Sequence, residues 1–73
     1  MVHDNTNYKP LFFDKFQEFY RKFPTYSLGE ILYSILSSAS KNGVKIDNKT
    51  DLLSVNDSQL YTAIDKAIIK EEE

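Results

Sequence analysis

The sequence predicts an all-α fold, a small domain of three helices over residues 10–23, 28–42 and 57–70. Apolar residues recur at helical spacing in all three segments, and recognisable start and stop signals bound them. The 73 residues are 41% hydrophobic and 14% aromatic, which is typical of a single globular domain and excludes a disordered chain. We expect residues 1–9 to form a disordered arm and residues 71–73 a frayed acidic tail.

The first predicted helix carries phenylalanines along one side. Four of them recur at i, i+4, i+7 and i+11, which places them in one narrow stripe: Phe12, Phe16, Phe19 and Phe23. Pro10 suits the first helical turn, where its missing N–H has no intrahelical partner. Pro24 ends the helix because it disfavours α geometry at the residue before it. We expect the stripe to face the core.

Capping residues define the ends of the other two helices. Ser27 and Glu30 have the spacing of a capping box before the second helix, and Asn56 and Gln59 have it before the third. Gly43 follows the second helix and can adopt the left-handed conformation that ends many helices. The residues predicted to face inward are Leu28, Ile31, Leu32, Ile35, Leu36 and Ala39 on the second helix, and Leu60, Ile64, Ala67 and Ile68 on the third.

The segment between the second and third helices has no clear periodicity. Residues 44–55 are interpreted as an ordered connector. Its apolar side chains would complete the core: Val44, Ile46, Leu52 and Leu53. The alternative is a short β-hairpin with its turn near residues 47–49.

The composition argues against catalysis. Cysteine is absent and His3 is the single histidine, so thiolate nucleophiles, disulfides and cysteine-ligated zinc are excluded and the commonest general base is scarce. Gly29 and Gly43 lie in no glycine-rich loop that could hold a phosphate. We therefore expect no enzyme activity, no cofactor, no metal and no small-molecule substrate.

The location and source are also suggested by composition. There is no apolar run near 18 residues, and the polar start does not resemble a secretory signal, so we expect a cytoplasmic protein with no membrane partner. The abundance of Lys, Asn, Ile and Tyr is typical of AT-rich bacterial or phage genomes.

Four apolar residues lie away from the predicted stripes: Leu11, Phe13, Tyr33 and Ile69. One interpretation is that Phe13 and Tyr33 complete the core. The functional interpretation is an apolar and aromatic patch that binds a partner protein. On this basis the chain is predicted to be a non-enzymatic interaction module, an adaptor or an inhibitor. In the alternative, the same patch is self-complementary and the chain is a homo-oligomeric structural subunit, since so short a domain often needs oligomerisation for stability.

A small nucleic-acid-binding regulator is the remaining alternative. Its candidate cations are Lys41, Lys45, Lys49, Arg21 and Lys22. The net charge is −2 and acidic residues separate the lysines after position 41, so nucleic acid is the less favoured partner.

Overall fold

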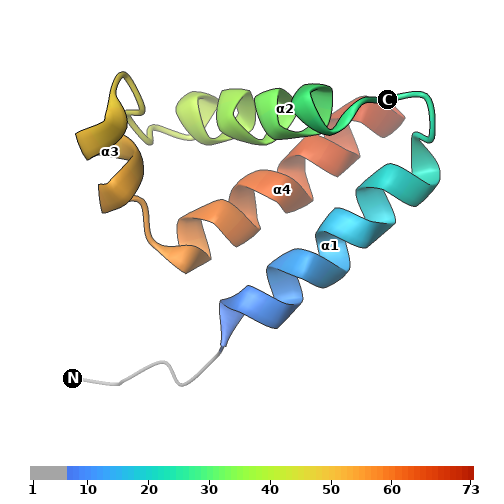
Figure 1. Cartoon of the computed structure of the whole chain (residues 1–73), viewed down its shortest axis with the longest axis horizontal. Helices are drawn as coiled ribbons and strands as arrows, with labels where there is room; N and C mark the ends of the chain where they lie inside the picture. Colours follow the sequence, from blue (N-terminus) through green and yellow to red (C-terminus); the bar gives the residue numbers. More distant parts are fainter. Residues whose placement is uncertain (1–6) are drawn as a thin grey trace.

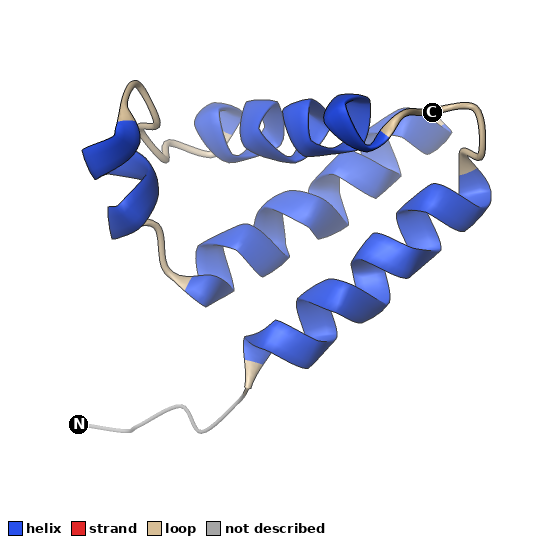
Figure 2. Ribbon diagram, viewed as in Figure 1, coloured by secondary structure: helices blue, strands red, loops and turns tan. Residues whose placement is uncertain are grey.

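The computed structural model describes residues 7–73 and confirms the all-α prediction. It contains α1 (Tyr8–Lys22), α2 (Leu28–Lys41), α3 (Lys49–Ser54) and α4 (Asp57–Glu72), with no strand in the described part of the chain (Figures 1 and 2). The three long helices are those predicted, and their boundaries differ by at most two residues from the expected ones.

Helix α4 is the centre of the fold. Both α1 and α2 pack against it, one on each side, whereas they have little contact with each other. Figure 1 shows α1 running in the same direction as α4 and α2 running back across it. Each of the outer helices therefore has one main neighbour, and the sides that α1 and α2 turn away from α4 are left uncovered.

The core is small and purely apolar, and α1, α2 and α4 all contribute to it: Phe19, Ile31, Ile35, Ala39, Ala63, Ile64, Ala67 and Ile68. Phe12, Phe16 and Phe23 are partly buried at its edge, so the predicted phenylalanine stripe contributes one fully buried ring. Leu28 and Leu32, predicted to face inward, are exposed. They lie on the side of the α2 stripe that α4 does not cover, and α1 does not cover it either.

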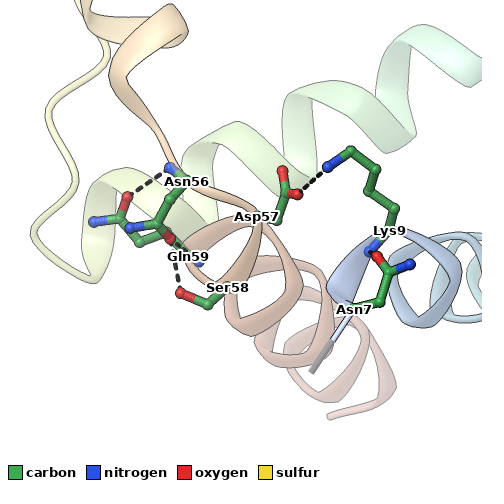
Figure 3. A network of polar contacts seen from close by, with 6 residues as sticks. All are labelled: Asn7, Lys9, Asn56, Asp57, Ser58 and Gln59. Atoms are coloured by element: carbon green, nitrogen blue, oxygen red, sulfur yellow. Dashed lines mark hydrogen bonds and ion pairs between the residues drawn. The ribbon is translucent and has the colours of Figure 1, made fainter. Parts of the chain in front are cut away.

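Helix α1 begins within residues 1–9, the segment that the sequence assigned to a disordered arm. Residues 1–6 lie outside the described residues, but Asn7 caps α1 by accepting a hydrogen bond from the Lys9 backbone N–H at 3.2 Å. Tyr8 stacks against Tyr61 with ring centroids 5.6 Å apart. Lys9 pairs with Asp57 at 2.6 Å and so joins the first turns of α1 and α4 (Figure 3). These contacts bring Tyr8 and Lys9 into the helix, where Pro10 still occupies the first turn.

The hairpin alternative for residues 44–55 is wrong, because the segment contains the short helix α3. The Asn48 side chain accepts from the Asp51 backbone N–H at 3.0 Å, and the Asp51 carboxylate accepts from the Asp47 N–H at 2.9 Å. Val44 and Ile46 pack against the core as expected, but the leucines of α3 are exposed: Leu52 and Leu53. None of the six residues of α3 is buried.

The acidic end of the chain is helical up to Glu72, where the sequence predicted fraying from residue 71. Lys22 pairs with Glu72 at 2.6 Å, and the Tyr26 hydroxyl donates to the Glu71 carboxylate at 2.5 Å. These two contacts offset the unfavourable interaction of carboxylates with the helix C-terminus. At the other end, α4 begins with the predicted capping box of Asn56 and Gln59 (Figure 3).

Candidate interaction surfaces

All four residues predicted to bind a partner are exposed. The exposed fractions are 37% for Leu11, 63% for Phe13, 74% for Tyr33 and 53% for Ile69, so Phe13 and Tyr33 do not complete the core. The structure does not gather the four into one groove. Phe13 lines a groove between α1 and α4, whereas Tyr33 lines a different one between α2 and α4. Leu11 and Ile69 line neither.

Phe13 instead belongs to a continuous row of rings along α1. Its ring lies edge-on to Phe12 at 5.6 Å, Phe12 lies 6.3 Å from Phe16, and Phe16 lies 6.2 Å from Tyr20. We call Phe12, Phe13, Phe16 and Tyr20 the aromatic ridge. Phe13 and Tyr20 are exposed, and the two rings between them are half-buried. The sequence identified Phe13 but placed Phe12 and Phe16 in the core.

An apolar groove of about 230 Å³ adjoins one end of the aromatic ridge. It lies where α1 and α4 begin, and its apolar lining includes Phe12, Phe13 and Leu60. The Lys9–Asp57 ion pair lies at its edge, so the two charges of the rim neutralise each other. Ridge and groove together form a largely aromatic surface.

A second groove, of about 420 Å³, separates α2 from α4 and has a different character. Its cations are Lys41 from α2 and Lys66 and Lys70 from α4. Lys66 donates to the Asn42 side-chain carbonyl at 3.1 Å. The Lys70 ammonium lowers the pKa of Lys41 below its ordinary value, first because a neutral Lys41 amine can accept a hydrogen bond from it and then because its positive charge disfavours a second ammonium. Serine side chains line the α2 wall: Ser34, Ser37 and Ser38. We call this the lysine groove.

The five cations of the nucleic-acid alternative do not converge. Lys22 is held by Glu72 and by Glu18, at 2.6 and 3.4 Å, and the hydrogen bond to Glu72 is the main reason that its pKa is raised. Lys45 faces Asp47 at 3.9 Å. Lys41 joins Lys66 and Lys70 rather than the other four candidates. Lys66 and Lys70 were not among the candidate cations; their spacing of one turn on the predicted third helix shows that they share a side of it, but not that Lys41 lies opposite.

Within residues 7–73, no three His, Cys, Asp or Glu side chains gather closely enough to hold a metal ion. None of the helices described is long and apolar enough to cross a bilayer. Comparison of the chain with protein-family models, with curated protein sequences and with solved structures found no match. A function must therefore be inferred from the two surfaces themselves.

Proposed function

We propose that the chain is a non-enzymatic protein-interaction module, a cytoplasmic adaptor or inhibitor of bacterial or phage origin, and that its aromatic ridge binds an apolar helix of a partner protein. The observation that carries the proposal is the unbroken contact of four rings along α1, of which Phe13 and Tyr20 are exposed. Aromatic side chains are enriched at protein interfaces because they bury a large area with little loss of conformational entropy.

The spacing of the rings favours a helical partner. Phe12, Phe16 and Tyr20 follow one another at i, i+4 and i+8, with centroids 6.3 and 6.2 Å apart. A row of side chains at i, i+4 and i+8 forms a ridge of the kind that packs into the groove between two side-chain rows of a second helix. The adjoining groove between α1 and α4 offers a hole for one anchor residue, as in other helix-in-groove complexes.

The test compares the ridge with the apolar residues outside it. Displayed amphipathic helical peptides would first be selected for binding to the native chain. The ridge variant is Phe13→Ser with Tyr20→Ser, and the matched control is Leu11→Ser with Ile69→Ser. All four side chains are exposed, so circular dichroism should show that both variants keep their helices. We expect selected peptides to bind the control and to lose binding to the ridge variant. Equal binding of the peptides to both variants would show that the aromatic ridge is not their binding site.

A homo-oligomeric subunit is the second candidate, and the exposed side of α2 favours it. Leu32 and Tyr33 are exposed there, and between Glu30 and Lys41 this helix carries no charge. Depletion of charge is typical of interface centres.

Light scattering coupled to size exclusion separates the two candidates. A dimer across α2 should dissociate on dilution over a hundredfold range of concentration, and Leu32→Ser with Tyr33→Ser should make the chain monomeric throughout. A native chain that is monomeric at every concentration contradicts the oligomer and leaves the aromatic ridge free for a different protein.

A further inference from the structure

The lysine groove is a surface that contains no residue of the aromatic ridge. Three ammonium groups from two helices line it, and Glu71 is the one carboxylate among its lining residues. None of the three lysines makes a salt bridge with any carboxylate of the described residues. We propose that the lysine groove binds a small phosphate-bearing anion, held between Lys41, Lys66 and Lys70.

The arrangement of the cations supports an anion at this place. Lys41, the last residue of α2, brings one positive charge to the groove. Lys66 and Lys70 add positive charge from the facing helix. Lys41 and Lys70 line the same groove, and the proximity of Lys70 lowers the pKa of Lys41, so an anion that contacts both would favour the charged form of Lys41.

The neutral donors indicate phosphate rather than a carboxylate. Ser34, Ser37 and Ser38 lie half-buried on the α2 wall of the groove, within one and a half turns of each other. A phosphate presents three or more acceptor oxygens in a tetrahedral arrangement, so it can accept from hydroxyl groups on one wall and from ammonium groups on the other. A volume of about 420 Å³ is that of a small-ligand pocket.

The surroundings favour a small anion over a nucleic acid. The neighbouring groove shares Tyr33, Ser34 and Glu71 with the lysine groove and adds Glu30. These two carboxylates end the positive surface on one side, so a phosphate polymer that continued past them would meet repulsion. Inorganic pyrophosphate, which carries several charges within a short length, is a suitable probe.

The experiment titrates inorganic pyrophosphate into the isotopically labelled chain and follows backbone amide signals, with sodium chloride added to the reference at equal ionic strength. The test variant is Lys41→Gln with Lys70→Gln. The control, Lys45→Gln with Lys49→Gln, removes the same charge from exposed positions outside the groove. We expect saturable shifts over residues 37–42 and 66–71 in the native chain and the control, and an affinity about tenfold or more weaker in the test variant.

Three results would overturn the proposal. The first is shifts no larger than those produced by sodium chloride. The second is an equal loss of affinity in the control and in the test variant, which would mean that pyrophosphate responds to net charge alone. The third is a single-stranded oligonucleotide that binds through Lys45 and Lys49 while pyrophosphate does not bind, which would assign the cations to nucleic acid.

Discussion

The two sides of α4 are held in contrasting ways. Towards α1, its carboxylates lie opposite lysines in a regular series: Lys9–Asp57 at 2.6 Å, Lys15–Asp65 at 3.1 Å and Lys22–Glu72 at 2.6 Å. Towards α2, α4 presents Lys66 and Lys70, and the facing helix adds another lysine instead of an acid. One side of α4 is therefore complementary in charge to its neighbour, and the other side is not.

The charges between α1 and α4 are therefore already paired within the fold, whereas those between α2 and α4 remain available to bind an anion. Each lysine of α1 that faces α4 already has a carboxylate within salt-bridge distance, so an external anion would have to compete with it. The cations of the lysine groove have no such carboxylate, and their own proximity is unfavourable. The apolar core holds both sides together, because it contains residues from all three long helices.

The largest expected loss of stability comes from truncating Phe19, which lies in the core shared by α1, α2 and α4. Phe19 is fully buried and its ring contacts Phe23 and Tyr26, which lie in and beside the turn that joins α1 to α2. Phe19→Ala should lower the free energy of unfolding by about 3–5 kcal/mol, enough to unfold so small a domain. Phe13→Ala, at an exposed ring, is the control. Thermal unfolding followed by circular dichroism measures both, and equal midpoints for the two variants would contradict the assigned core.

A smaller effect is expected where α2 ends. Gly43 has φ +89°, and a Cβ built on it would meet no atom within 4 Å, so a side chain there costs backbone strain rather than a clash. Gly43→Val should reduce stability by about 1 kcal/mol or more. Gly29→Ala should have the opposite sign, a gain of about 0.5 kcal/mol, because its Cβ makes an ordinary contact at 3.8 Å with the Ser27 hydroxyl. Urea denaturation of the two variants compares them directly.

Removing one lysine from each side of α4 tests the comparison itself. Lys15 lies near Asp65 and Glu18, and its hydrogen bond to Asp65 is the main cause of its raised pKa. Lys15→Gln should destabilise the fold by about 0.2–1 kcal/mol. Lys41→Gln should leave stability unchanged or increase it, since it removes a repulsion. Urea denaturation at low salt gives the sign of the change in unfolding free energy for each variant. In 1 M sodium chloride, which screens the charges, the two variants should have similar stability. If both substitutions destabilised the fold, the two sides of α4 would not differ in charge complementarity as described.

The smallest effect concerns high pH. Donation of a hydrogen bond to Glu71, and secondarily burial, raises the pKa of Tyr26 above its ordinary value of about 10. The folded state therefore holds this proton more tightly than the unfolded state. The stability that follows is fully present below pH 10 and is lost as the pH rises through the higher pKa of the folded state. Tyr26→Phe should make alkaline unfolding, followed by circular dichroism, less steep. An unchanged slope would mean that the Tyr26 hydroxyl does not contribute.

Local signals in the sequence predicted the helices well. The two capping boxes and Gly43 act over three or four residues, so their positions could be recognised without knowing the rest of the fold. The start of α1 and the end of α4 were placed two residues short, because Lys9 and Glu72 are held by partners about fifty residues away. Helix α3 was missed, since six residues contain too few turns for an apolar period.

The surfaces were harder to predict because they depend on which helices touch. A helical wheel gives the direction of a side chain but not whether a neighbour covers it. Phe12 and Phe16 were assigned to the core, yet they are half-buried because α2 does not pack on α1. The lysine groove joins Lys41 to Lys70 only through the crossing of α2 and α4, which no local pattern contains.

The central position of α4 has a consequence for the order in which the chain can fold. A ribosome completes α1 and α2 before it begins α4, so both outer helices are synthesised before their main neighbour exists. An isolated helix of 14 or 15 residues is marginal in water. The first two helices are therefore only marginally stable until α4 has been synthesised. Pairing α1 with α4 then closes a loop of about fifty residues, which is a non-local contact for a small helical protein. A nascent chain interrupted before residue 57 would expose its phenylalanines to chaperones and proteases instead of folding.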